Sequence, residues 1–406
     1  MRPTFYQASL QDVRLPPQPP VTIRDEAAPV PPPAVRGTPR GCERPYCGPE
    51  QNSRIAFAFS RKTTAVAWKV PIPSGFRAEF VLASADRIVL DLRRAWLLLD
   101  HAGKVVQQEA RAAGDIVADS NLGLLYAPTE SGYLAAYNLS EGKRTFLLSL
   151  YFANDFLRSF ILPLGRRLLV ASVERQNDPH GKREPNMAVV ELHEFSMPFE
   201  LSDAGRLKSE RRVNDIKRRT ATLKVAARGD TVALATDNAV YLADTDLKLQ
   251  TELTSEFEPL HLSLDELSRI HMTVRRTGGE AEYWTLTPSG QRTARVPLPS
   301  EFTPTEPPII AFDRSVYLID SSRVLAIDPS TQRIRWDRML GSVAGAVTDA
   351  DNALLVSAGN AIVGISTSGE PHVVFRAEGD VLTSPPSVTP SGDLIVAGER
   401  FLYLLR

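Results

Sequence analysis

The 406-residue sequence has few cysteines and no long apolar run. No stretch reaches the roughly 18 consecutive apolar residues that a membrane-spanning helix requires, so we expect no membrane span. The first residues lead into charged and proline-rich sequence, without the apolar core and small-residue cleavage site of a secretory signal. Together these absences predict a cytoplasmic protein.

An excess of charge of one sign is also lacking. The chain has 47 Lys and Arg residues against 48 Asp and Glu residues, which gives a formal net charge of -1 at pH 7. Such a molecule is not attracted as a whole to nucleic acid or to anionic lipid. We therefore do not expect nucleic acid to be a partner, and any such binding would have to be local.

The two cysteines, Cys42 and Cys47, are separated by four residues. They could close a small disulfide loop, share a metal ion, or stay free thiols in a reducing compartment. A structural zinc ion needs four ligands, and no histidine lies nearby in the sequence. We therefore prefer free thiols, and we predict neither a metal site nor a cofactor.

Proline, in contrast, is concentrated at one end of the chain. Twelve of the 31 prolines fall within residues 1–54, and Pro31, Pro32 and Pro33 form one of the runs. Such a segment favours polyproline II and lacks the periodic apolar side chains that build a core. We predict an extended arm over residues 1–54 and a folded domain over 55–406. The arm is either a docking peptide, with these prolines as candidate partner-binding residues, or a linker.

From about residue 63 the sequence consists of short apolar runs that end in polar turns. A turn residue follows such a run at Asp100, Asn138, Asp244, Thr287, Asp328 and Ser366. The neighbouring separations are 38, 43, 41 and 38 residues, while the gap of 106 between 138 and 244 must contain one expanded repeat. We place its turn at 202–205 and an inserted loop at 175–185. A period near 40 with several short strands is typical of a β-propeller blade.

Each repeat also begins with a strand of small and β-branched residues, which suits packing near a crowded propeller axis. These predicted inner strands lie at 123–128, 231–236, 315–319 and 353–358.

The chain ends in the middle of a repeat. Residues 385–389, 394–398 and 401–406 are typical of three strands of a blade, and 64–70 has the character of the missing outer strand. We predict that Thr64–Val70 pairs antiparallel with Phe401–Arg406, with Trp68 covering the outer part of this composite blade. Seven internal repeats and the composite blade make eight, with seven blades as the alternative. The predicted fold is therefore an all-β propeller of about eight four-stranded blades.

One repeat resembles a known family. The run from Arg323 to Trp336 reads RVLAIDPSTQRIRW. It resembles the quinoprotein-like (PQQ-type) repeat, in which a strand ending in Leu-x-Ala-Leu-Asp precedes a Thr-Gly turn and an outer strand ending in Trp. Gln332 stands where the turn glycine is usual, and most other repeats lack the Trp. The resemblance implies a propeller of a family that includes both quinone-dependent dehydrogenases and non-catalytic assembly scaffolds.

The sequence favours the non-catalytic class. A quinone dehydrogenase is expected to be secreted and to carry a calcium-binding Glu/Asn/Asp set and an Asp base, and no motif aligns with these. The six histidines, at 101, 180, 193, 261, 271 and 372, have no metal-ligand or nucleophile-base spacing. We predict no enzymatic activity and no small-molecule substrate. The alternative is a ligand-binding or quinoprotein-type catalytic propeller that uses its central funnel, which convergent polar groups at one end of the channel would favour.

The segment 208–219 has six basic and two acidic side chains. It is either a surface for an acidic protein segment or a phosphate backbone, or a solvated outer strand with an inter-blade loop. Aromatic residues do not alternate with these charges, so stacking of single-stranded nucleic acid is not supported. The candidate partner-binding residues are Lys208, Arg211, Arg212, Lys217, Arg218 and Arg219. We predict a protein-interaction scaffold, a component of a larger assembly that binds other proteins through its arm and blade faces.

Overall fold

The computed structural model describes Phe59 and most of residues 64–406. Residues 85–86, 94, 111–114, 120, 130–132, 150–155, 165–166, 175–186, 195–210, 220–221, 229 and 255–256 lie outside the described part. The predicted arm, both cysteines, the inserted loop at 175–185 and the expected turn at 202–205 therefore also lie outside it.

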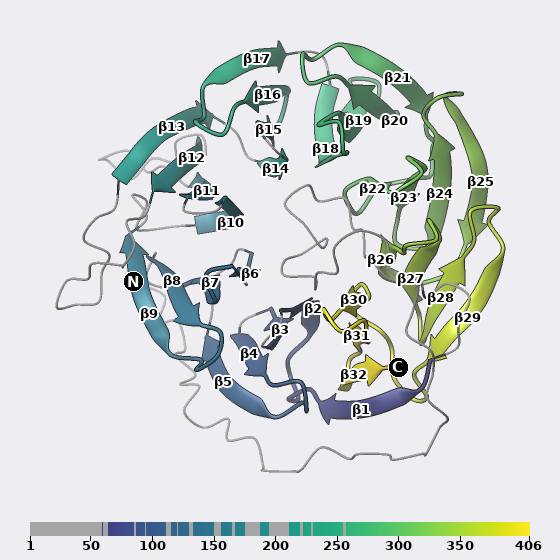
Figure 1. Cartoon of the computed structure of the whole chain (residues 1–406). Coiled ribbons are helices and arrows are strands. Elements are labelled where there is room, and N and C mark those ends of the chain that lie inside the picture. The colour runs from purple at the N-terminus through teal and green to yellow at the C-terminus, as the bar shows by residue number, and fades with distance from the viewer. Residues whose placement is uncertain are drawn as a thin grey trace, which may run out of the picture.

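The described residues form eight separate four-stranded antiparallel sheets arranged in a ring (Figure 1). Within each sheet every strand pairs with the next, as short reversing connections require. This arrangement confirms the predicted all-β propeller and its count of eight blades. No helix in the described part of the chain is long and apolar enough to cross a membrane.

Seven blades consist of four consecutive strands each. The first three are β2 (Ala78–Ala83), β3 (Ile88–Leu92), β4 (Ala95–Leu99) and β5 (Val105–Ala110); β6 (Val117–Asp119), β7 (Leu124–Pro128), β8 (Tyr133–Asn138) and β9 (Arg144–Ser149); and β10 (Phe156–Leu164), β11 (Arg167–Glu174), β12 (Met187–Glu194) and β13 (Arg211–Arg219). The other four are β14 (Lys224–Arg228), β15 (Thr231–Ala235), β16 (Ala239–Ala243) and β17 (Leu249–Thr254); β18 (Phe257–Leu264), β19 (Ile270–Arg276), β20 (Ala281–Leu286) and β21 (Arg292–Pro297); β22 (Ile309–Ile310), β23 (Val316–Ile319), β24 (Arg323–Asp328) and β25 (Arg333–Met339); and β26 (Val343–Thr348), β27 (Leu354–Ala358), β28 (Ala361–Ile365) and β29 (Pro371–Arg376).

The eighth blade joins the two ends of the domain. Its strands are β30 (Ser387–Val388), β31 (Leu394–Ala397), β32 (Phe401–Leu405) and, outermost, β1 (Val66–Pro71). β1 is antiparallel to β32, with Trp68 opposite Leu404, and Ala65 and Arg406 exchange backbone hydrogen bonds of 2.8 and 2.9 Å. The predicted ring closure is thus confirmed. In this blade the third strand, β32, and the fourth strand, β1, are not directly connected along the chain, whereas in the other seven blades the third strand leads directly to the fourth.

The six predicted turn residues all lie at connections between third and fourth strands. Asp100 illustrates why a short polar side chain is needed there. Its Oδ1 accepts hydrogen bonds from the backbone N–H groups of Ala102 (3.0 Å) and Lys104 (2.8 Å). Thr287 Oγ1 likewise accepts from the N–H of Gln291 at 3.0 Å. Such local bonds satisfy backbone donors that no strand can reach.

In each of the eight blades the outermost strand carries a β-bulge. In seven blades the bulge follows the connection between the third and fourth strands, and in the composite blade it lies in β1. In β25, for example, Trp336 pairs with Ala326 and Ile334 with Ile327, so Arg335 is the extra residue. The register shifts of the other outer strands leave the extra residues Ala67, Val106, Thr145, Val213, Gln250, Thr293 and Val374. A bulge bends its strand and re-aims the extra side chain, which is how Thr293 and Arg335 come to face a common space.

The four predicted inner strands are second strands, which corrects their expected position. They correspond to β7, β15, β23 and β27, and a further strand lies inside each of them. Some innermost strands, such as β22 with two residues, are too short to give a pattern. The apolar cores lie between adjacent blades, as in the cluster that joins Leu169 of β11 to Val232 of β15. Each sheet is therefore covered on both faces by its neighbours.

Candidate functional site

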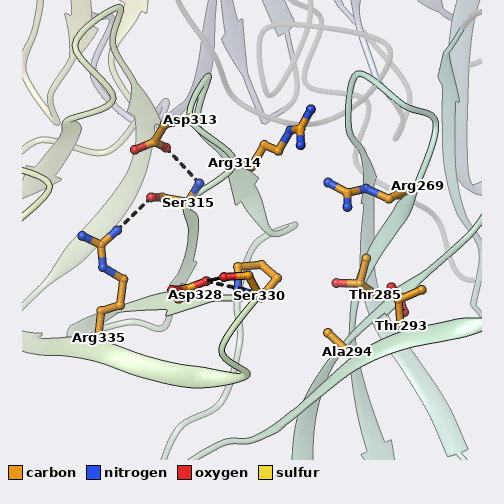
Figure 2. A pocket seen from close by; sticks show the side chains of 11 residues that line it. Arg269, Thr285, Thr293, Ala294, Asp313, Arg314, Ser315, Asp328, Ser330 and Arg335 are labelled. Carbon is orange, nitrogen blue, oxygen red and sulfur yellow. Dashed lines mark hydrogen bonds between the residues drawn. The ribbon is translucent and has the colours of Figure 1, made fainter.

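A pocket of about 520 Å³ opens between the blade β18–β21 and the blade β22–β25. It lies beside the turns that connect β18 to β19, β22 to β23 and β24 to β25, and none of its lining residues belongs to an innermost strand. The lining residues are Arg269, Thr285, Thr293, Ala294, Asp313, Arg314, Ser315, Asp328, Pro329, Ser330 and Arg335 (Figure 2). Hydrogen-bond donors therefore dominate this wall.

Arg335 forms one side of the pocket. As the extra residue of the bulge in β25, it donates from Nη1 to Ser315 Oγ (3.0 Å) and from Nη2 to the carbonyl oxygen of Thr367 in the following blade (3.3 Å). The backbone N–H of Ser315 in turn donates to Asp313 Oδ1 at 2.9 Å. Both acceptors of Arg335 are uncharged, so neither of them offsets its positive charge next to the pocket.

Arg314 occupies a strained backbone position. Its φ is 69°, and its N–H donates to the carbonyl oxygen of Ala311 at 3.1 Å. The same position in the corresponding turns of three other blades is held by Ser268, Asn352 and Gly392. Residues with a Cβ are disfavoured in this left-handed region, and glycine and asparagine tolerate it best. An arginine here costs stability without adding to the turn.

A buried chain of polar groups leads to the pocket from behind. His271 lies between Asp265 and Tyr283, with Nε2 3.3 Å from Asp265 Oδ2 and Nδ1 2.6 Å from Tyr283 Oη. Tyr283 Oη is 2.9 Å from Thr285 Oγ1, and Thr285 lines the pocket. Arg269, also on the wall, donates from Nε to Asp265 Oδ2 at 2.6 Å. Four buried residues are thus connected from a carboxylate to the pocket surface.

Burial and hydrogen-bond partners shift the pKa values of Asp265 and Tyr283 in this buried network. Burial alone would raise the pKa of Asp265, but the hydrogen bond and charge of His271, together with hydrogen bonds from Arg269, hold it well below its usual range. Burial raises the pKa of the Tyr283 hydroxyl. Asp265 is therefore ionised and Tyr283 protonated at neutral pH.

The two carboxylates on the pocket wall are held by nearby donors. Asp328 Oδ1 accepts hydrogen bonds from the N–H (2.9 Å) and the hydroxyl (2.6 Å) of Ser330. The hydroxyl bond from Ser330 is the main reason why the pKa of Asp328 is lowered. Asp313 accepts the bond from Ser315 described above. Both carboxylates are therefore held close to their own turns.

The candidate partner-binding residues of the sequence lie elsewhere. Arg211, Arg212, Lys217, Arg218 and Arg219 belong to β13, the outermost strand of its blade, on a different part of the ring from β24 (Figure 1). An outer strand was one of the two interpretations of this segment, and its backbone placement agrees with it. Lys208 and the run Pro31–Pro33 lie outside the described residues. Their role as contacts stays a prediction.

Sequence patterns alone did not identify the pocket. Its residues come from three turns and four strands of two neighbouring repeats, and no single motif contains them. One signal was present, since Arg314 occupies the turn position that is Asn352 or Gly392 in the next two blades. That comparison requires the turns to be aligned first, which the two-residue strand β22 prevents.

Another carboxyl group with a buried oxygen, that of Glu306, lies away from this pocket, before β22. Glu306 Oε2 is buried without a hydrogen-bond partner among the described residues. Burial raises the pKa of Glu306 to about 8, although a backbone hydrogen bond from Ala346 acts in the opposite direction. Within the described residues, no three His, Cys, Asp or Glu side chains form a group that could hold a metal ion.

Comparison with known proteins gives structural matches. No protein-family model matches the sequence, and no curated protein matches it. BamB from Moraxella catarrhalis has a TM-score of 0.57 at 13% identity, covering 85% of this chain and 98% of its own. Sqt1 from Saccharomyces cerevisiae has a TM-score of 0.55 at 13% identity, covering 87% of this chain and 98% of its own. Identities this low show the fold alone, which is a β-propeller.

Proposed function

We propose that this protein is a non-enzymatic interaction scaffold, a non-catalytic relative of the quinoprotein-like propellers that binds other proteins as part of a larger assembly in the cytoplasm. The observation that carries the proposal is the pocket between two blades, where side chains from three turns present cations and hydroxyls on one face of the ring. Protein partners bind rigid propellers through such turns because the blades hold them in fixed positions. Two further surfaces, the arm and β13, belong to the proposal on the strength of their sequences.

The described buried carboxylates support a structural use of polar groups. Asp380 Oδ1 accepts the backbone N–H of Arg400, and its Oδ2 accepts the N–H of Phe401 and the hydroxyl of Tyr403, at 2.9–3.1 Å. Asp349 Oδ2 accepts the N–H of Phe59 at 3.0 Å. These groups hold turns and the entry of β1 in place.

A small-molecule site is the second candidate function. The observation in its favour is the buried chain that runs from Asp265 through His271 and Tyr283 to Thr285 on the pocket wall. Such a chain could transfer a proton to a bound molecule. The predicted central funnel is not its location, because the pocket lies between blades. A ligand that is consumed by the purified protein would favour this function over the scaffold.

The scaffold proposal is tested by isolating the protein from its native host at native expression level and low salt. We expect it to co-purify with other proteins in fixed ratios, well above its own mass of 44.7 kDa. A chain that elutes alone at that mass contradicts the proposal.

Two variants then separate the surfaces: deletion of residues 1–54, and reversal of Arg211, Arg212, Arg218 and Arg219 to Glu. Each should weaken association if its surface is used, and the charge reversal should act most strongly at low salt.

A further inference from the structure

The pocket between the two blades places three guanidinium groups around one space, and neither carboxylate on its wall, Asp313 or Asp328, pairs with Arg314. Arg269 and Arg314 come from equivalent turns of neighbouring blades, and their guanidinium groups extend from opposite sides toward the same space (Figure 2). Like charges that face one another are unfavourable unless an anion lies between them. The arrangement is therefore that of a receptor for a negatively charged group.

Arg314 is the cation that is most available to a ligand. Its side chain makes no hydrogen bond or ion pair with any described residue, whereas Arg269 uses its Nε on Asp265 and Arg335 uses two nitrogens on neutral oxygens. The Nη groups of Arg269 are the second available donors. A planar guanidinium presents paired N–H groups that match the two oxygens of a carboxylate.

The backbone at Arg314 indicates that this side chain is needed for something other than the turn. Its φ of 69° places a bulky residue where Asn352 and Gly392 stand in the following blades. Such strain accumulates at binding sites and is offset by the rest of the fold. The turn itself would be more stable with asparagine or glycine.

The charge balance of the pocket selects the type of anion. Three arginines and two aspartates line it, which gives the lining a formal charge of +1, while Asp265 behind it is already held by Arg269 and His271. A monoanion fits this balance, while a phosphate dianion would face Asp313 and Asp328 with too little positive charge. The hydroxyls of Thr285, Thr293 and Ser330 add neutral hydrogen-bonding groups to the same space (Figure 2).

We infer that the pocket binds the carboxylate of an Asp or Glu side chain in an acidic segment of a partner protein, with Arg314 and Arg269 as the main donors. This inference rests on the proposed scaffold function and names the chemistry that the partner must present. A volume of about 520 Å³ accommodates one or two side chains rather than a folded element. The rest of the partner would lie on the surrounding turns.

The test uses the purified full chain and four probes: a fluorescein-labelled hexapeptide with two central Glu residues, its Gln and phosphoserine counterparts, and inorganic phosphate as competitor. We expect the Glu peptide to bind about tenfold more tightly than the Gln peptide, because only the Glu carboxylate can form hydrogen bonds with arginine in which both groups are charged. A tenfold difference in affinity corresponds to roughly 1.4 kcal/mol. Arg314→Asn, which suits the backbone position, should weaken the Glu peptide about tenfold. The control Arg333→Asn changes an exposed arginine of the same blade that does not line the pocket, and should leave binding within about twofold.

Each other outcome overturns the inference. Equal binding of the Glu and Gln peptides, no binding at all, or an unchanged affinity of Arg314→Asn would show that the pocket is not a carboxylate receptor. Tighter binding of the phosphoserine peptide, or competition by phosphate at similar concentration, would make it a phosphate site. The scaffold proposal survives any of these results if the native protein still co-purifies with partners.

Discussion

The indole N–H of Trp68 donates a hydrogen bond of 3.0 Å to the carbonyl oxygen of His101. It joins the first strand of the domain, which closes the ring, to the turn of the following blade. The ring of Trp68 also packs against the turn at Gly103, and Trp336 of β25 repeats both contacts at the interface with the blade β26–β29, at Thr367 and Gly369. The outer strand and the next turn thus form one unit at these two interfaces.

Replacing Trp68 should destabilise the whole ring. The side chain is 7% exposed and belongs to a cluster that spans the composite blade and its neighbour. We expect Trp68→Ala to lower the free energy of unfolding by about 3–5 kcal/mol, from the lost burial and the cavity. Trp68→Phe keeps most of the apolar contact but not the hydrogen bond, so its cost should be smaller. Chemical denaturation measures both; a loss below about 1 kcal/mol for Trp68→Ala would show that the closure does not depend on this contact.

Gly103 and Gly75 form a matched pair for testing the contact between blades. Both have positive φ, 83° and 86°, but a Cβ on Gly103 would lie 2.7 Å from Val70 Cγ2 and 3.3 Å from Trp68 Cε3, whereas a Cβ on Gly75 meets nothing within 4 Å. Gly75→Ala should therefore cost about 1 kcal/mol from backbone strain. Gly103→Ala should cost about 2–4 kcal/mol because packing against β1 is added. Equal losses in thermal or urea unfolding would contradict the close approach.

Arg314→Asn should separate stability from binding. Asparagine tolerates a φ near 69°, so the variant should be as stable as the wild type or more stable by up to about 1 kcal/mol. Its affinity for an acidic partner should fall at the same time. Differential scanning calorimetry checks the first expectation. A clear fall in the melting temperature would mean that Arg314 stabilises the turn, and its position would no longer indicate a binding role.

Glu306 should make the free energy of unfolding fall as the pH rises between about 4.5 and 8. Its pKa is raised to about 8 from 4.5, because Oε2 is buried without a partner. The folded state therefore holds a proton that the unfolded state has released, and this contribution is complete below about pH 4.5 and is lost as the pH rises through about 8.

The variant Glu306→Gln is neutral at every pH and supplies the control. Compared with it, the wild type should lose on the order of 2–4 kcal/mol of unfolding free energy between pH 5 and pH 9. Urea titrations of both proteins across that range measure the difference. Parallel pH profiles would show that Glu306 is ionised in the folded protein.

The sequence predicted the features that are encoded locally or by repetition. Turn residues such as Asp100 were visible because the side chain bonds to N–H groups two and four positions along the chain. The ring closure was visible because both halves of the composite blade carry strand patterns, and β1 pairs with β32 as expected.

The pocket required knowledge that no local pattern contains. Its charged residues become neighbours only when the turns of two blades are brought side by side, and Arg335 turns toward it because of a bulge. Strain at Arg314 cannot be recognised before the position of its turn is known, and β22 is too short to mark that position. The His271 chain was missed for a similar reason, since its members lie on three different elements of one blade.

The most direct test of the scaffold with its acid-binding pocket is photo-crosslinking in the living host. A photoreactive amino acid at Ser330, an exposed residue on the pocket wall, should give a defined protein adduct. The same group at Thr277, exposed in the turn between β19 and β20, is the control and should not give that adduct. Adding Arg314→Asn should remove most of the Ser330 adduct, and the captured protein should present an acidic segment at the crosslink. No protein adduct at Ser330, or one that persists unchanged with Arg314→Asn, would contradict the account.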